Sequence, residues 1–185
     1  MSANANTFPL LVSVDVETNG PCPGEFALVS IGAVVIEPEL GRTFYCEVSP
    51  PEGSVRWLPK AYEVNGVSRD AHLVMPAPDV GMASLESWLG KIQSGEDTPL
   101  VLVSDNLAFD WQFISYYCWR YLNYNPFGYW GLNIPDIARG MSGVLDVVVP
   151  RRDDWKKLRR TPHTHHALDD ARGNAEAMLA LLARN

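Results

Sequence analysis

Apolar residues gather in short runs in the first third of the chain, in a pattern typical of β-strands. We expect strands over 10–17, 27–36 and 44–49. The second of these, ALVSIGAVVI, is almost wholly apolar and should therefore lie centrally in a sheet. The turn signal EPELGR between the second and third strands favours antiparallel pairing of the early strands. A later apolar run, PLVLVSD, predicts a fourth buried strand over 99–105.

Helical patterns dominate the rest of the chain. Amphipathic segments predict three longer helices, over 82–92, 110–122 and 167–184. The proline-rich segment 50–80 is expected to be a loop with one short helix near PKAYEV, and a short strand and helix are expected within 128–141. A helical crossover precedes the fourth strand, which should therefore run parallel to the first. This order predicts an α/β fold with a mixed central β-sheet flanked by helices.

Length and composition narrow the class of protein. The 185 residues suggest a single domain over 1–185, with 1–8 as a flexible amino terminus. Hydrophobic residues make up 46% of the chain, which is enough for a core. No apolar run approaches the ~20 residues of a membrane span, and the start MSANANTFP lacks the features of a signal peptide, so we expect a cytoplasmic protein. Three widely spaced cysteines, in no CxxC pair, favour reduced thiols over a disulfide scaffold or a cysteine zinc site.

The net charge of −7 bears on the possible partners. A protein that coats nucleic acid through a broad basic surface is usually positive, so this balance disfavours a passive binding module. An enzyme whose acids hold metal ions stays compatible with it, because bound cations reverse the sign of the local charge.

Two acids end the first predicted strand, in LLVSVDVETNG. Strand side chains alternate between faces, so Asp15 and Glu17 should point the same way at the carboxyl end of the strand. That end is where α/β sheets place ligand sites. A solvated strand end is the alternative for an isolated D-x-E pattern.

A third acid follows the fourth predicted strand, in SDNLAFDWQF. Steps of three and four residues place Asp110 on an otherwise apolar helix face, so it should point inward beside the core. Asp105, at the strand end, is the competing candidate. The alternative for Asp110 is a simple acid at a helix amino terminus, where the macrodipole favours it by about 0.3–1 kcal/mol.

The closing helix begins with two neighbouring aspartates. Asp170 aligns with the apolar stripe of this helix and should point inward. Asp169 is expected on the wet side of the helix, together with Arg172, Gly173 and Glu176.

Histidines cluster just before this helix. His165 lies about one turn before the inward aspartate, with His163 and His166 beside it. A histidine zinc site is the alternative reading of the cluster, although no cysteine and no H-E-x-x-H pattern supports it.

Four inward acids from separate elements share an explanation if they converge. Two charges ~5 Å apart repel by roughly 3 kcal/mol at an effective dielectric of about 20. Four acids make six pairs, so the total is on the order of 10 kcal/mol, comparable to the stability of a whole domain. Such a cluster must protonate, spread apart or bind cations, and its oxygen-only ligands suit two Mg²⁺ ions, with Mn²⁺ as a substitute, better than zinc.

Three motifs in order, DVETNG, SDNLAFDWQF and HHALDDA, resemble the exonuclease motifs of the DEDD superfamily in its histidine-bearing DEDDh subgroup. Ribonuclease T, oligoribonuclease and polymerase proofreading subunits belong to that subgroup. The resemblance implies a ribonuclease H-like fold and metal-dependent 3′-to-5′ exonuclease activity. It also implies which residues hold the metal ions and which histidine takes the proton of the attacking water. The implied metal ligands are Asp15, Glu17, Asp110 and Asp170, and the implied general base is His165.

Substrate contacts follow partly from the resemblance. It implies that Thr18 and Asn106 position the last nucleotide through hydrogen bonds. Phe109, next to Asp110, is the aromatic residue best placed to stack on a terminal base, ahead of Trp57 and Trp111. Many members carry a histidine before the asparagine of the second motif. This chain has Asp105 there, which changes the local contacts.

The stretch RRDDWKKLRR, at 151–160, concentrates six of the fifteen basic residues shortly before the histidines. It can hold the phosphate backbone of a substrate, and a solvated loop is the alternative.

The sequence therefore predicts an enzyme that acts on the 3′ end of single-stranded nucleic acid, with RNA as the expected substrate and release of nucleoside 5′-monophosphates. A DNA-preferring exonuclease of proofreading or repair is the alternative within the same chemistry. A catalytically silent nucleic-acid-binding module is the alternative of another class, which the complete acid set and His165 disfavour. A homodimer is expected from the resemblance alone.

Overall fold

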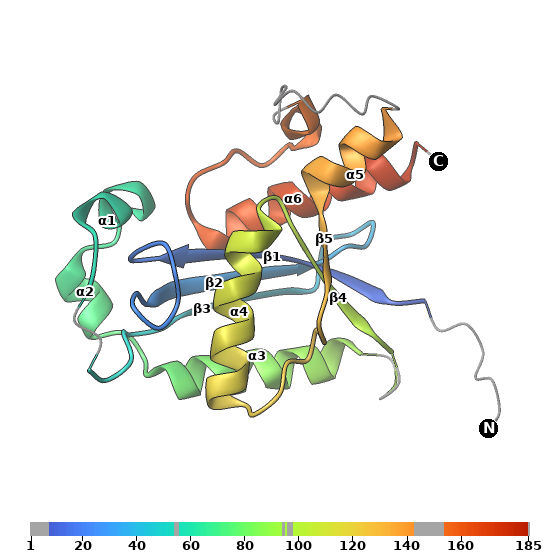
Figure 1. Ribbon diagram of the computed structural model, residues 1–185. Helices are drawn as coiled ribbons and strands as arrows, with labels where there is room; N and C mark the ends of the chain where they lie inside the picture. The colour runs from blue at the N-terminus through green and yellow to red at the C-terminus, as the bar shows by residue number, and fades with distance from the viewer. Residues whose placement is uncertain (1–7, 54–55, 94, 96–97, 143–153, 185) are drawn as a thin grey trace.

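Five strands form one mixed sheet in the order β3-β2-β1-β4-β5 (Figure 1). The computed structural model describes residues 8–53, 56–93, 95, 98–142 and 154–184. Its strands are β1 (Leu10–Thr18), β2 (Leu28–Val35), β3 (Thr43–Glu47), β4 (Leu100–Ser104) and β5 (Gly131–Asn133). The first three strands pair antiparallel, whereas β4 runs parallel to β1 and β5 runs parallel to β4. The expected pairing of the strands is confirmed.

Helices cover both faces of this sheet. They are α1 (Pro59–Asn65), α2 (Arg69–Leu73), α3 (Pro78–Ile92), α4 (Leu107–Tyr121), α5 (Ile134–Met141), the 3₁₀ helix η1 (Asp154–Leu158) and α6 (Ala167–Leu182). Helices α3 and α4 pack on one face, and α6 packs on the other with α5 and η1 beside it (Figure 1). The short helices α1 and α2 lie beyond the carboxyl end of β1.

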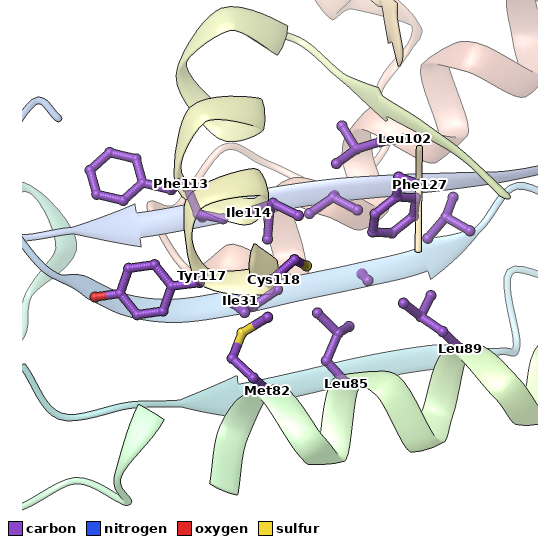
Figure 2. Close-up of a cluster of buried hydrophobic side chains, with 14 of the residues drawn as sticks. Ile31, Met82, Leu85, Leu89, Leu102, Phe113, Ile114, Tyr117, Cys118 and Phe127 are labelled. Carbon is purple, nitrogen blue, oxygen red and sulfur yellow. The ribbon is translucent and has the colours of Figure 1, made fainter. Parts of the chain in front are cut away.

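The larger core lies between the sheet and the pair α3 and α4. Figure 2 shows Met82 and Leu85 of α3 pointing toward Ile31 of β2 and Cys118 of α4, and all four side chains are buried. The alternation in β1 serves both faces, because Val12 and its i+2 neighbours join this core while Leu11 packs with α6 on the opposite side. Each strand face is thus covered, as a central strand requires.

The predicted elements exist, with four differences. Helix α3 begins at Pro78, four residues earlier than expected, because proline at the first helical position is compatible with a helix start. Helix α4 begins at Leu107 rather than at 110. The helix α2 was missed within the segment expected to be a loop; Ser68 caps it by accepting a hydrogen bond from the Ala71 amide at 3.1 Å. The 3₁₀ helix η1 was also missed.

Residues 1–7 of the expected flexible terminus lie outside the described residues, and Phe8 is exposed. None of the helices in the described part of the chain is both long enough and apolar enough to cross a bilayer.

Gly32 on β2 allows α6 to approach the sheet at the point that matters for the site. It is the register partner of Asp15 on β1. A Cβ atom at Gly32 would lie 2.2 Å from the backbone carbonyl of Ala167, the first residue of α6. The absence of a side chain therefore brings the amino end of α6 next to the carboxyl end of β1.

Candidate active site

Acids from three elements meet at the carboxyl end of β1. Carboxylate oxygens of Asp15, Glu17 and Asp170 lie within 4.8 Å of one another. Asp110, from the first turn of α4, reaches the same strand, because the Val16 amide donates a hydrogen bond of 3.1 Å to its Oδ1 atom. Asp15, Glu17 and Asp170 thus meet as predicted, and Asp110 lies close enough for its charge to act on Asp15 and Glu17. Asp15, Asp110 and Asp170 are buried as expected.

Asp110 is held on both carboxylate oxygens. Besides the Val16 amide on Oδ1, the Ser104 hydroxyl at the end of β4 donates to Oδ2. The same Ser104 oxygen accepts a hydrogen bond from the Asn106 amide at 3.1 Å, which fixes the turn between β4 and α4. Each carboxylate oxygen has two lone pairs, so Asp110 keeps acceptor positions for a further partner.

Asp170 is the most heavily bonded acid of the group. Its Oδ2 atom accepts from the His165 amide at 2.9 Å, and its Oδ1 atom accepts from the Thr164 amide at 3.2 Å. The Arg159 guanidinium lies 2.7 Å from Oδ1, and Nδ1 of His163 lies 2.8 Å from the same atom. Oδ1 is thus surrounded by donors, while Oδ2 retains a lone pair that can serve a cation.

The backbone of His165 adopts a left-handed conformation, with φ of 58°. This conformation is uncommon for residues other than glycine. It lets the consecutive amides of Thr164 and His165 point at the Asp170 carboxylate, so the histidine and the acid are fixed relative to each other.

Burial and mutual repulsion raise the pKa values of three carboxylates of the site. Burial raises the pKa of Asp15 well above its usual range, and the charges of Asp110 and Glu17 raise it further. Burial, followed by repulsion from Asp170 and Asp110, raises the pKa of Glu17 to about 8. Burial also raises the pKa of Asp110 to about 7, against the opposing hydrogen bond from Ser104. Asp105, which stands where many DEDDh members have a histidine, contributes to this repulsion at Asp15 and Asp110. It is thus a fifth acid in the electrostatics of the site.

This arrangement fits divalent cations. The converging ligands are hard carboxylate oxygens from rigid elements, and cations would offset the repulsion that the raised pKa values report. A second group of potential ligand atoms within 4.8 Å comprises His163, His165 and Asp170. The histidines of the zinc alternative thus lie together, although the amides and the arginine on Asp170 occupy much of its coordination capacity.

A cavity of about 450 Å³ opens over Asp15, Glu17 and Asp110, which line it. The predicted substrate residues Thr18, Asn106 and Phe109 line it together with His165, so these four positions do lie at one site. The Thr18 hydroxyl donates to the Gly20 carbonyl at 2.8 Å, which leaves its oxygen as an acceptor. Leu58, Lys60, Ala61 and Val64, on and just before α1, form a wall of the cavity that the sequence analysis did not assign.

Two of the aromatic candidates lie elsewhere. Trp57 packs against Tyr62, with ring centroids 5.9 Å apart, and the Arg69 guanidinium lies 4.8 Å from its ring. Trp111 lines a neighbouring cavity rather than the one over the acids. Asp169 is half-buried and its carboxylate lies 3.8 Å from Nδ1 of His166.

The prediction that Gly173 and Glu176 lie on the solvent-exposed side of α6 is wrong. Glu176 is buried, because the loop after η1 covers it: the Arg160 and Thr161 amides donate to its Oε2 atom at 2.6 and 2.7 Å. These hydrogen bonds lower the pKa of Glu176 against the opposing effect of burial. Gly173 is buried under the Arg159 guanidinium, which a Cβ atom would approach to 2.3 Å.

The basic stretch has more than one role. Residues 151–153 lie outside the described residues, and Lys157 pairs with Asp154 at 2.6 Å. Arg159 faces inward to Asp170 rather than outward to solvent. Its Nη1 atom also lies 3.4 Å from Oδ1 of Asn174, whose amide donates to Asp105 at 3.5 Å. Sequence reasoning missed Arg159, since no local pattern distinguishes it from its basic neighbours.

Comparisons with known proteins agree with this geometry. The family described as 3'-5' exoribonuclease Rv2179c-like domain matches residues 11–182. The chain is 38% identical over 170 residues to the 3'-5' DNA exonuclease Cap18 of Escherichia coli, covering 90% of this chain and 88% of that protein.

Solved structures agree on the fold. The nuclease domain of 3'hExo, a DEDDh family member bound to rAMP, superposes with a TM-score of 0.74 at 14% identity, covering 98% of this chain and 96% of that one. The zinc-bound complex of E. coli ExoI with single-stranded DNA gives 0.71 at 16% identity, covering 96% of this chain and 41% of that one. At such identities the likeness concerns the fold, and the expected ribonuclease H-like architecture is confirmed.

Proposed function

The chain belongs to the 3'-5' exoribonuclease Rv2179c-like domain family, and we propose that it is a metal-dependent 3′-to-5′ exonuclease that removes nucleoside 5′-monophosphates from single-stranded RNA. The proposal extends to 1–185 as one domain. The observation that carries it is the convergence of Asp15, Glu17, Asp110 and Asp170 beside one cavity with His165 on its wall.

The four acids would hold two Mg²⁺ ions, for which Mn²⁺ can substitute. When bound, these ions supply a water of lowered pKa and neutralise charge on the leaving 3′ oxygen. Asp110 and Asp170 are oriented for this role by donors on their outer sides, from Ser104 and from the 164–165 backbone. Held in this way, they need little rearrangement to act as ligands.

His165 would act as the general base that takes the proton of the attacking water. Its imidazole lines the cavity, and its backbone is tied to Asp170, so the base keeps a fixed position relative to the acids. The ring of His163 lies beside it, with centroids 4.3 Å apart in an edge-to-face arrangement, and limits the orientations open to His165.

The terminal nucleotide would lie in the 450 Å³ cavity. Phe109 and Leu58 provide apolar surface for its base on the walls formed by α4 and the start of α1. Thr18 and Asn106 would position its sugar through hydrogen bonds. Lys60 places a cation on the same wall, where a phosphate can use it.

The second candidate is a DNA-directed enzyme, which the 38% identity to a DNA exonuclease favours. End-labelled RNA and DNA strands of one sequence, incubated with Mg²⁺ or EDTA, distinguish the two. We expect Mg²⁺-dependent shortening from the 3′ end, faster for RNA, and its loss in Asp110→Asn. Faster shortening of DNA would reverse the assigned preference. Binding without shortening, in the presence of Mg²⁺ or Mn²⁺, would instead indicate a silent binding module.

A further inference from the structure

A second cavity, of about 520 Å³, lies beside the first, between the start of α4 and the segment leading into β5. Three aromatic residues, Trp111, Tyr129 and Trp130, line it. Tyr129 is 85% exposed and Trp130 is 59% exposed. Two adjacent large aromatic side chains in contact with water form an apolar surface of the kind that marks binding sites.

This aromatic groove is continuous with the candidate active site. Asn106, at the amino end of α4, lines both cavities. The same residue lines a third hollow of about 260 Å³, to which Arg139 of α5 and Lys156 of η1 also contribute. The two cavities and the third hollow thus meet at Asn106, the residue before α4.

We propose that the aromatic groove of Trp111, Tyr129 and Trp130 binds an unpaired base of the substrate strand, on the 5′ side of the terminal dinucleotide. The proposal rests on the proposed function, since it takes the occupant of the first cavity to be the 3′ end of a strand. A strand that leaves that cavity past Asn106 meets the groove next.

The chemistry of the lining matches a nucleobase. Aromatic faces stack on any base, which suits an enzyme that must advance along a strand of varied sequence. The groove has a polar edge as well, formed by Asn106, Asn133 and Asp136. The Asn133 amide is already engaged, since its Oδ1 atom accepts from Leu107 and its Nδ2 atom donates to Asp136, so it shapes the groove rather than reading the base. This leaves stacking as the main source of affinity and predicts little dependence on sequence.

Two cations, Arg139 and Lys156, line the third hollow, which meets the two cavities at Asn106. Arg139 lies 3.4 Å from Asp136, and the Lys156 ammonium lies 5.9 Å from the ring of Trp155. Asp105 and Asp136 line the same hollow, so its charges nearly balance. A phosphate passing there gains little net attraction, and the aromatic side chains must supply most of the binding.

The test compares substrate lengths. Tyr129→Ala and the double variant Tyr129→Ala/Trp130→Ala are assayed on a dinucleotide, which is too short to place a base in the groove, and on a longer homopolymer. We expect the double variant to raise KM for the homopolymer roughly tenfold, with the dinucleotide unaffected, because stacking on one aromatic side chain contributes at the scale of a five- to hundredfold change in affinity. The single variant, at a more exposed position, should show a smaller change in the same direction.

Trp119→Ala is the matched control. Trp119 is an exposed tryptophan on the same helix, at 49% exposure, but does not line the groove. It should leave KM for both substrates unchanged. Binding of a fluorescent homopolymer in EDTA gives a readout that does not need turnover, and thermal melting of each variant checks its fold.

The outcomes separate the two proposals. The proposal that the groove binds a base is refuted if wild type and double variant have equal KM for the homopolymer. It is also refuted if the double variant raises KM equally for both substrates. A shift of the double variant from dimer to monomer in sedimentation, with unchanged binding, overturns it in favour of an interface between two copies of the chain. Absence of hydrolysis by the wild type refutes the proposed function, while weaker homopolymer binding by the double variant in EDTA would still identify the groove as a strand-binding site.

Discussion

Replacing Arg159 with alanine should destabilise the metal-free protein strongly, and the size of the effect should depend on Asp105. The guanidinium and the Asp170 carboxylate form an ion pair of 2.7 Å with 5% and 1% of their side chains exposed. The other side of the guanidinium reaches Asp105 through Asn174. Arg159 therefore neutralises one acid directly and lies one amide away from the acid that departs from the family motif.

The magnitude follows from burial. Removing one partner of a buried ion pair costs about 3–5 kcal/mol, because the remaining charge stays buried and unpaired. For a chain of this length each kcal/mol corresponds to roughly 2–4 °C in Tm, so we expect Arg159→Ala to lower Tm by roughly 6–20 °C. Two opposite charges roughly 7 Å apart attract by about 2 kcal/mol at an effective dielectric of about 20, which is the expected order of the coupling between Arg159 and Asp105.

A double-mutant cycle measures this coupling. Arg159→Ala, Asp105→Asn and the double variant are unfolded by urea in EDTA. We expect Arg159→Ala to cost about 1–2 kcal/mol less in the Asp105→Asn background. Arg160→Ala is the control. The Arg160 side chain is next to Arg159 in the sequence but is 79% exposed, so this substitution should change the free energy of unfolding by less than about 0.5 kcal/mol. If the two substitutions add within about 0.5 kcal/mol, Arg159 does not balance the fifth acid and the argument is refuted.

Three further predictions concern the site itself. His165→Asn, which tolerates the left-handed backbone at φ of 58°, should lower kcat by about 10²–10⁴-fold with little change in Tm; full activity in a single-turnover assay would remove this histidine from the mechanism. In EDTA the free energy of unfolding should fall as the pH rises from about 5 to 8. The reason is that Glu17 and Asp110 have raised pKa values of about 8 and about 7, so they keep their protons to higher pH in the folded than in the unfolded state. Urea unfolding across this range should show the fall, and Mn²⁺ in place of EDTA should suppress it. Gly32→Ala should lower both Tm and activity at an overpacking cost of about 1–3 kcal/mol, since its Cβ atom would meet the Ala167 backbone at 2.2 Å, and unchanged melting and turnover would show that α6 need not approach so closely.

The inward direction of the four acids could be predicted from sequence, because the side-chain repeat of a strand or helix fixes the face on which each acid lies. The two-residue alternation of β1 puts Asp15 and Glu17 on one side, and the helical period puts Asp110 and Asp170 on inward faces. These rules need only neighbouring residues, so they hold before the tertiary structure is known. The electrostatic argument then joined the four positions, and the structure brings them together.

What the sequence did not predict depends on contacts between distant segments. Glu176 is placed on a wet face by the helical period, yet the loop after η1 covers it with two backbone amides. Arg159 belongs to a stretch whose charges suggest solvent or phosphate, and its inward direction is set by the space over Gly173. Helix α2 was missed because it is five residues long, and its local signals, chiefly the cap at Ser68, are weak for so short a helix.

The fifth acid and the inward arginine are best understood together, as features that keep the pocket folded when no cation is bound. Burial and neighbouring charges already raise the pKa values of Asp15, Glu17 and Asp110, and Asp105 adds to the repulsion at Asp15 and Asp110. Protons can relieve part of this repulsion, but a proton on a ligand must leave before a metal ion binds. A buried guanidinium supplies positive charge without occupying the lone pair of Asp170 Oδ2 that a cation needs, because it bonds to Oδ1. We therefore expect Arg159 to stabilise the metal-free pocket without blocking it, and its coupling to Asp105 is the quantity that would distinguish this role from that of an ordinary buried ion pair.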